Sequence, residues 1–183
     1  MNLKELTWEN HKSAERKAFA GILLSGKISA ELYHKYLVNQ LSNYTVIEYA
    51  LKKLAFPDEF RGVFRTNKII RDVYELENDF GCRHRLSLIT KSTAEYVDHV
   101  HALLEKEDVD GVIAHMYVRH FGDMYGGAII AKRVPGSGKM YEFDDKEKLK
   151  HDIRLLLNDT MADEANKCFE YAIRLFEELS NEE

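Results

Sequence analysis

The sequence predicts an all-α fold in a single domain over residues 1–183, built from about seven or eight helices. The first observation is composition: the 183 residues include only two prolines and ten glycines, with many Leu, Glu, Lys and Ala, which favours long helices over sheets. The second is periodicity, because apolar residues recur three and four positions apart along most of the chain. The third is size, since 45% hydrophobic residues over this length suffice for one complete core and not comfortably for two.

The N-terminal third is expected to hold two helices. Residues 2–25 keep the helical period, and Gly26 is a stop signal at their end. Residues 28–56 form the longest periodic run and begin at a Ser29 cap. This second helix ends before Pro57, because the residue that precedes a proline disfavours the α region.

The middle of the chain predicts two further helices. Residues 66–79 are amphipathic at the helical period and end near Gly81. Ser92 and Glu95 have the S-x-x-E spacing of a capping box, which predicts a helix from there to about Lys106.

The C-terminal part is expected to be helical on both sides of a loop, with no strand signal. The sequence P-G-S-G at 135–138 predicts that loop. Asp144 or Asp145 then caps a helix through about Asn158, and Thr160, in the spacing T-x-x-D, caps the last helix.

Charge and cysteine content exclude several classes of function. The net charge of −5 argues against a nucleic-acid-binding surface, which needs a clustered basic excess. Cys82 and Cys168 are isolated in the sequence, so they predict no metal-binding pair or disulfide and indicate a reducing compartment. No signal peptide and no apolar run of about 20 residues is found. We therefore expect a soluble, cytoplasmic protein without a membrane anchor.

Residues 115–127, H-M-Y-V-R-H-F-G-D-M-Y-G-G, carry three glycines in a segment whose flanks are helical in pattern. A glycine inside a helix costs roughly 0.5–1 kcal/mol relative to alanine, so three of them do not serve stability. On a helix, Gly122 and Gly126 lie four residues apart, so one face of the helix would carry no side chain there and the helix could bend. A flat ligand could then lie against the bare backbone. Alternatively, Asp123 lies in a turn and caps a helix that begins near Tyr125. The spacing alone leaves both interpretations open.

One histidine lies on the inner stripe of the first predicted helix. His11 is flanked on that stripe by the small residues Ala14 and Ala18, and Glu15 lies one turn further on, within reach of a ring nitrogen. A single histidine on an apolar stripe is usually a satisfied core residue. Here, however, the small neighbours leave room for a ligand beside the His11 ring, and the Glu15 carboxylate is placed to fix the tautomer of the imidazole.

Two further groups of polar residues have a structural and a functional interpretation. Lys146, Lys150 and Arg154 fall four apart on one predicted helix. Such a ridge usually faces water, but arginine also binds ligand carboxylates well. His99 and His101 are two apart and diverge on a helix, so they predict a solvated or interfacial pair rather than a metal site.

Several familiar catalytic motifs are absent from the sequence. It contains no phosphate-binding glycine loop with its lysine, no C-x-x-C, no H-E-x-x-H and no G-x-S-x-G, nor the E-x-x-H repeats of a di-iron bundle. What remains is an inner histidine, a glycine-lined segment with an aspartate, and basic residues for anionic groups. This combination suits haem, which takes an imidazole on its iron and cations at its propionates.

Three segments together resemble a known family. T-W-E-N-H-K-S-A-E at 7–15 is similar to the proximal-histidine segment of the haem oxygenases, and 115–127 resembles their distal-helix signature. A-I-R-L-F-E-E-L at 172–179 is similar to their last helix. The sequence thus resembles the haem oxygenase family over nearly its whole length. The resemblance implies the helical haem oxygenase fold, with haem between the proximal and distal helices.

The resemblance also implies roles for the residues on both sides of the haem iron. His11 would be the axial ligand, with Glu15 as its hydrogen-bonding partner. On the distal side Asp123 would organise the water molecules. The other members of the same hydrogen-bond network would be Tyr44, Tyr96 and Arg119.

Further residues are implied to contact the haem itself. Lys4, Tyr117, Lys150 and Arg154 match positions that the family uses toward the propionates, and Phe169 matches an aromatic wall of the pocket. Gly122, Gly126 and Gly127 would form the distal backbone and its bend. One departure is Ala172, which stands where vertebrate members have a network asparagine.

The activity implied by the resemblance is the cleavage of haem b, which is both cofactor and substrate. With O₂ and electrons the products would be biliverdin, expected to be the IX-alpha isomer, CO and ferrous iron. The electrons would come from an external donor, a ferredoxin or a reductase, and a bilin reductase is a possible downstream partner. The sequence ends without the hydrophobic anchor of vertebrate members, so a soluble microbial- or phage-type form is expected.

Two other functions stay open at this stage. A haem-binding or delivery protein would need His11 but neither Asp123 nor the glycines. A thiaminase-like, non-haem helical enzyme would be favoured by a catalytic cysteine, but Cys82 and Cys168 fall in no recognisable motif.

Overall fold

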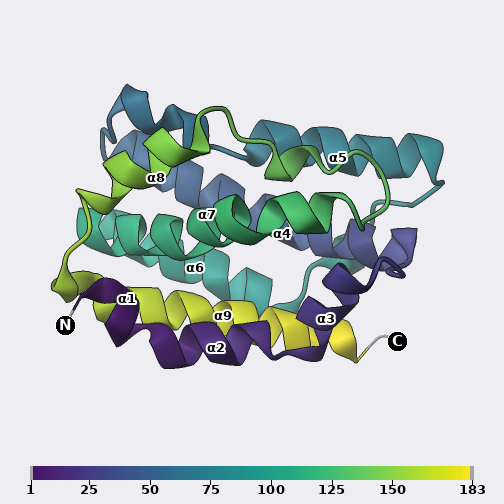
Figure 1. Ribbon diagram of the computed structural model, residues 1–183, viewed down its shortest axis with the longest axis horizontal. Coiled ribbons are helices and arrows are strands. Elements are labelled where there is room, and N and C mark those ends of the chain that lie inside the picture. The colour runs from purple at the N-terminus through teal and green to yellow at the C-terminus, as the bar shows by residue number, and fades with distance from the viewer. Residues whose placement is uncertain (1, 182–183) are drawn as a thin grey trace.

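The computed structural model describes residues 2–181 and contains nine α-helices and four short 3₁₀ segments in that range, with no strand (Figure 1). The helices are α1 (Leu3–Leu6), α2 (Trp8–Glu15), α3 (Ala18–Ser25), α4 (Ala30–Lys53), α5 (Thr66–Asp79), α6 (Lys91–Glu105), α7 (Val109–Ala131), α8 (Lys146–Arg154) and α9 (Ala162–Ser180). The 3₁₀ segments are η1 (Asp58–Val63), η2 (Leu86–Leu88), η3 (Lys139–Tyr141) and η4 (Asp159–Met161). The all-α prediction is confirmed.

The predicted single helix at 2–25 is wrong, because this stretch forms α1, α2 and α3. The hydroxyl of Thr7 donates to the carbonyl oxygen of Leu3 at 2.9 Å, which offers the backbone an alternative to continuing the helix. Lys17 has extended backbone, with φ −66° and ψ 144°, and separates α2 from α3. The division leaves α2 as a separate segment that packs along α9.

The longest helix, α4, packs against α5, α6 and α7. It begins at the predicted Ser29 cap, whose hydroxyl accepts a hydrogen bond from the amide of Leu32 at 3.1 Å. Its apolar residues are almost completely buried, but five polar side chains of the helix are buried as well: His34, Asn39, Gln40, Asn43 and Glu48. Because burying unpaired polar groups is costly, these side chains indicate an internal polar network.

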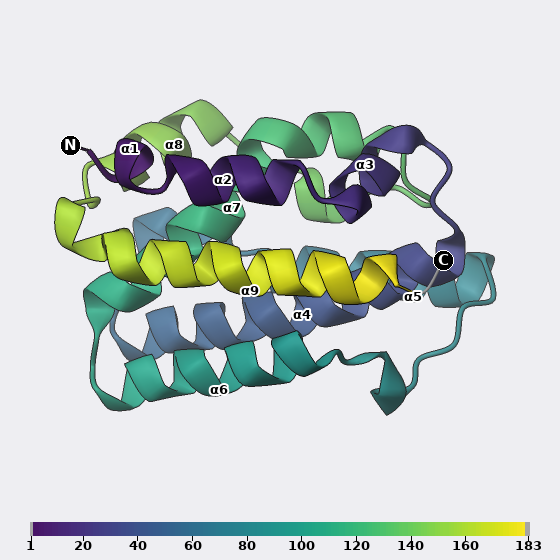
Figure 2. The same cartoon turned by 90° about the horizontal axis from the view of Figure 1, so that it is seen from below.

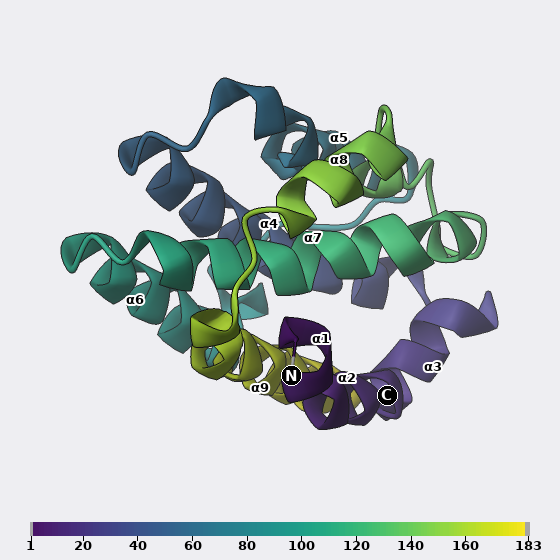
Figure 3. The same ribbon diagram turned by 60° about the vertical axis from the view of Figure 1, so that its left-hand side comes forward.

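The distal-signature segment lies in one uninterrupted helix, α7, that passes through all three glycines. Asp108 caps this helix, and its carboxylate accepts from the amide of Gly111 at 2.8 Å. The alternative in which Asp123 caps a new helix near Tyr125 is therefore wrong. Figure 3 shows α7 between α8 on one side and α2 and α9 on the other, and it packs directly on α8 and α9.

The predicted capping box of Ser92 and Glu95 is also wrong. Thr90 caps α6 instead, and its hydroxyl accepts from the amide of Thr93 at 3.2 Å. Ser92 and Glu95 both turn toward α9, where Ser92 hydrogen bonds to a glutamate carboxylate and Glu95 pairs with Arg174. Figure 2 shows α9 lying between α2 and the pair formed by α4 and α6. Residues of α9 are therefore close enough to compete with the backbone for both side chains.

The predicted caps of the last two helices differ from those observed. Asp145 precedes α8 but makes no side-chain cap hydrogen bond, and α8 ends at Arg154 rather than near Asn158. Thr160 does not cap α9, because it lies inside η4, where it hydrogen bonds to the side chain of Asn158. Within residues 2–181 no helix is both long and apolar enough to cross a bilayer.

Candidate functional site

The His11 imidazole on α2 is held between two aromatic rings. It stacks on Trp8, with ring centroids 5.6 Å apart, and meets Phe169 of α9 edge-on at 5.8 Å. Its Nδ1 lies 3.7 Å from a carboxylate oxygen of Glu15 and has no hydrogen-bond partner. The side chain is 42% exposed, so His11 is not a satisfied core histidine.

The three glycines of α7 lie in two different environments. A Cβ atom built on Gly122 or Gly126 meets no other atom within 4 Å, so both positions border open space. A Cβ on Gly127 would lie 2.5 Å from Cδ1 of Tyr141, which shows that Gly127 permits close packing of η3 on α7. The open face of α7 thus comprises Gly122 and Gly126, and Gly127 has a packing role.

This difference predicts opposite effects of alanine on stability. Gly122→Ala or Gly126→Ala is expected to stabilise the ligand-free protein by roughly 0.5–1 kcal/mol, because alanine favours the helix and fills only open space. Gly127→Ala is expected to destabilise it by about 1–3 kcal/mol through overpacking against Tyr141. Urea denaturation of the three variants measures both effects. A destabilising Gly126→Ala would show that this face is not open.

Asp123 projects from α7 into a buried polar cluster. The Tyr44 hydroxyl of α4 donates a hydrogen bond to Oδ2 of Asp123. Burial raises the pKa of the Asp123 carboxyl to about 6, although the Tyr44 hydrogen bond and the charges of His120, Arg65 and Arg119 act in the opposite direction. A carboxyl group with this pKa exchanges a proton near neutral pH.

The raised pKa of Asp123 predicts how stability depends on pH. The native carboxyl holds its proton to about pH 6, but the unfolded one loses it near pH 3.9, so stability falls as pH rises between these values. Asp123→Asn removes the charge and keeps an acceptor for Tyr44. It should stabilise the protein by about 1–3 kcal/mol at pH 7.5 and by almost nothing at pH 4. Urea denaturation at both pH values tests this, and an equal gain at both would contradict it.

Arg119 and Tyr96 border the same cluster. The Arg119 guanidinium lies 4.1 Å above the Tyr96 ring and donates to Oε1 of Gln40 at 3.3 Å, and its Nε has no partner. The Tyr96 hydroxyl points elsewhere and hydrogen bonds to Nδ1 of His115 at 3.0 Å. Tyr96 therefore meets the Asp123 cluster through its ring and Arg119, not through its hydroxyl.

Sequence reasoning missed several members of this cluster. On α4 the Gln40 side-chain amide donates to the Tyr36 hydroxyl at 2.8 Å, and the Asn43 amide donates to Oε1 of Gln40 at 3.1 Å. On α7 the His120 ring lies edge-on to the Tyr44 ring, with centroids 4.8 Å apart. The available signal was the spacing of these polar residues, three and four apart on an otherwise apolar helix face.

The predicted basic residues of α8 meet an aromatic residue of α7. Lys150 Nζ lies 4.3 Å from the centroid of the Tyr125 ring, and Arg154 donates to the Tyr125 hydroxyl. Lys150 is only 6% exposed, so of the two interpretations the one in which the ridge faces water is wrong at this position. Tyr117 is also on α7, and its ring packs against that of Phe121. Lys4, in contrast, is exposed on α1.

The α2 and α7 segments that the resemblance assigns to the two sides of the haem contribute to one hydrophobic cluster. Ala14 of α2, Phe169 of α9, and Tyr117 and Phe121 of α7 contribute to the same hydrophobic cluster. Around it lie an imidazole with an unpartnered nitrogen, an open glycine face and two cations on α8. These features fit a flat, anionic ligand with a metal centre, which is the chemistry of haem.

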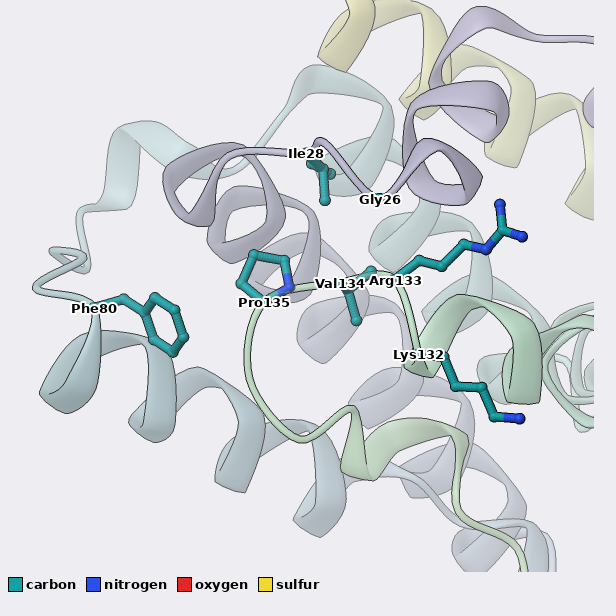
Figure 4. Close-up of a pocket in the computed structure, with 7 residues that line it drawn as sticks. All are labelled: Gly26, Ile28, Phe80, Lys132, Arg133, Val134 and Pro135. Carbon is teal, nitrogen blue, oxygen red and sulfur yellow. The ribbon is translucent and has the colours of Figure 1, made fainter.

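A separate surface pocket lies at the end of α7 (Figure 4). Ile28, Phe80, Val134 and Pro135 line it, and the Lys132 and Arg133 side chains point away from these apolar groups. None of the predicted site residues borders this pocket, so we assign it no part in the candidate site.

Comparison with known proteins identifies the family. A sequence profile described as Heme oxygenase matches residues 1–178. Heme oxygenase 2 of Rattus norvegicus is 28% identical over 97% of this chain and 64% of the relative, so the chain spans less than two thirds of that relative. Heme oxygenase 1 of Synechocystis is 27% identical over 97% of this chain and 82% of the relative.

Solved structures similar to this chain include two haem oxygenases. Heme oxygenase-1 of Synechocystis in complex with heme superposes with a TM-score of 0.83 and 25% identity, covering 98% of this chain and 91% of that one. Heme oxygenase from Leptospira interrogans gives a TM-score of 0.82 and 25% identity, covering 97% of this chain and 100% of that one. Because the family profile matches nearly the whole sequence, this chain belongs to the haem oxygenase family.

Proposed function

We propose that this protein is a haem oxygenase that cleaves haem b to biliverdin, CO and ferrous iron. The observation that carries the proposal is the open face of Gly122 and Gly126, which directly flanks the half-buried, hydrogen-bonded Asp123. A protein that only stores or delivers haem needs an axial ligand. It does not need a carboxyl group with a pKa near neutrality beside a cleared helix face. Membership of the family supports the same activity.

The residues that would hold haem are distributed over α1, α2, α7, α8 and α9. His11 would bind the iron through its imidazole, and Glu15 would orient the ring from one turn away. Phe169 would form a wall beside that ring. The groups positioned for the propionates would be Lys4, Tyr117, Lys150 and Arg154. The backbone of Gly122 and Gly126 would lie against the other face, and Gly127 would support it from behind through its packing on η3.

Bound haem supplies the redox-active iron and the ring carbon that is oxidised. The chain's contribution on the distal side is to hold and move protons. Asp123 would orient a water molecule and exchange its proton, while the Tyr44 hydroxyl fixes the carboxylate. Arg119 of α7 and Tyr96 of α6 would keep this network in place, and the Tyr36–Gln40–Asn43 chain would extend it along α4.

The proposed reaction needs O₂ and electrons from outside the protein. Cys82 and Cys168 are both buried and far apart in sequence, so they do not form an iron–sulfur motif. We propose a ferredoxin as the donor, with a reductase as the alternative, and a cytoplasmic location where both occur. The bilin product would pass to a bilin reductase.

An absorption time course tests the proposed function. The purified protein is mixed with hemin, then supplied in air with a ferredoxin system or with ascorbate, and CO is trapped by a globin. A Soret band that decays while bilin absorption grows, with CO released, is the expected result. A Soret band that forms and persists would identify a haem carrier. A Soret band that stays identical to that of free hemin would contradict haem binding altogether.

A further inference from the structure

Three side chains of types that can bind a metal ion converge from three helices, outside the Asp123 cluster. They are His99 of α6, His115 of α7 and Glu164 of α9. Oε2 of Glu164 lies 2.7 Å from Nε2 of His99 and 3.0 Å from Nε2 of His115, and the three atoms all lie within 4.8 Å of one another. His115 precedes Asp123 by about 12 Å along the helix axis, so this is a second location on α7.

The sequence pattern did not reveal this convergence. His99 and His101 diverge on α6 as expected, and His101 packs its ring near that of Tyr49. The partners of His99 are instead on other helices, where sequence spacing gives no guidance. Only the packing of α6 and α7 against α9 brings the three side chains together.

The His115 ring is oriented as metal-ligating histidines are. It is fully buried, and its Nδ1 is engaged by the Tyr96 hydroxyl at 3.0 Å, which leaves Nε2 toward Glu164. A ligating histidine nearly always uses its second ring nitrogen in such a hydrogen bond, because that bond fixes the tautomer and the direction of the free lone pair.

We propose that His99, His115 and Glu164 form a binding site for a divalent transition-metal ion, of which Zn²⁺ is the simplest representative. Two imidazoles and one carboxylate are a common ligand set for Zn²⁺, with water in the fourth position. The Glu164 and His99 side chains are 16% and 21% exposed, so the ion and its water have access from solvent.

The two distances from Oε2 of Glu164 to the imidazole nitrogens are close to those that the ion requires. In a tetrahedral site with bonds of about 2.0–2.1 Å, neighbouring ligand atoms lie about 3.3 Å apart. The observed 2.7 Å and 3.0 Å therefore need to expand by a few tenths of an ångström. The second oxygen of Glu164 pairs with Lys167 at 2.5 Å. Lys167 is half-exposed, so its flexible chain can move into solvent when an ion binds.

A second cluster provides an internal comparison. His34, Glu77 and His84 also place their ligand atoms within 4.8 Å of one another. There His84 is half-exposed and its Nδ1 is 3.6 Å from Glu77, a looser arrangement. Because the two clusters share no residue, substitutions in each report on one site alone.

Calorimetric titration of the haem-free protein with Zn²⁺ tests the proposal, together with Co²⁺ absorption as a report on coordination. The wild type and His84→Ala should bind Zn²⁺ at the proposed site with equal affinity and give the visible bands of tetrahedral Co²⁺. His99→Ala and Glu164→Gln should each weaken this binding at least tenfold and remove the bands. Glu164→Gln keeps the shape of the side chain and one oxygen that can accept from an imidazole, but it removes the charge that binds the ion, so its effect in a folded variant separates metal ligation from a loss of packing.

The opposite pattern would overturn the proposal. Absence of Zn²⁺ binding by the wild type would show that the cluster is only a network of hydrogen bonds and ion pairs. Loss of binding in His84→Ala with full binding in His99→Ala would place the ion at the other cluster. Circular dichroism of each variant establishes that it is folded before the titration.

Discussion

Replacing His11 by alanine is expected to weaken or abolish the absorption spectrum of the haem complex that depends on a histidine bound to the iron. The helical content should stay unchanged. The imidazole is 42% exposed and contacts chiefly Trp8 and Phe169, so its loss costs little packing. It does remove the nitrogen that we assign to the iron. We expect the affinity for hemin to fall at least tenfold, about 1.4 kcal/mol.

A hemin titration followed by absorption, with circular dichroism of the same samples, measures both parts of this result. His151→Ala is the matched control, because His151 is an exposed histidine on α8. Imidazole added to His11→Ala should restore the spectrum of the wild-type complex, since the space left by the side chain admits the free base. A variant whose spectrum equals that of the wild type would exclude His11 as the axial ligand.

The helices that the sequence predicted well are those defined by local signals. For α4 the apolar period, the Ser29 cap and the stop before Pro57 all act within a few residues, and the helix runs close to the expected limits. The amphipathic pattern over 66–79 likewise matches α5. Local propensity and tertiary packing agree in these segments, so the pattern is sufficient.

The errors arose where a distant partner competed with a local signal. Ser92 and Glu95 have the spacing of a capping box, but partners on α9 take both side chains. In α7 the spacing of the glycines left a turn and a continuous helix both open, and packing on both sides keeps the helix continuous. Neither outcome is encoded within a short window of sequence, because it depends on which helices become neighbours.

The candidate site was also predicted in part, and the missing part again depends on contacts between helices. The resemblance named Tyr44 and Asp123, and the structure brings them into hydrogen-bond contact across α4 and α7. The hydrogen-bond chain through Gln40 and the edge-on contact of the His120 ring with Tyr44 were not predicted. They depend on how the helices are oriented about their axes, which the sequence pattern does not give. The assigned roles of these residues stay predictions that the variants must test.

Replacing Asp123 by alanine is expected to preserve haem binding and to reduce bilin formation at least about 100-fold, the usual loss when a positioned proton-transfer group is removed. Asp123 is the carboxyl group that directly flanks the open face of Gly122 and Gly126, and its hydrogen-bond partner is Tyr44. Alanine at this position leaves the Tyr44 hydroxyl without its acceptor. Haem should then be consumed in peroxidase-like side reactions without forming bilin, as followed by absorption and CO release.

Two further variants separate the role of the carboxyl group from a general disturbance of α7. Asp110→Ala removes an exposed carboxylate of the same helix that contacts Asn158, and it should leave bilin formation unchanged. Tyr44→Phe keeps the Asp123 carboxyl but removes the hydrogen bond that fixes it, so an intermediate rate is expected. If Asp123→Ala gave the wild-type bilin yield, proton delivery would not depend on this carboxyl group, and the raised pKa of Asp123 would be only a consequence of its burial.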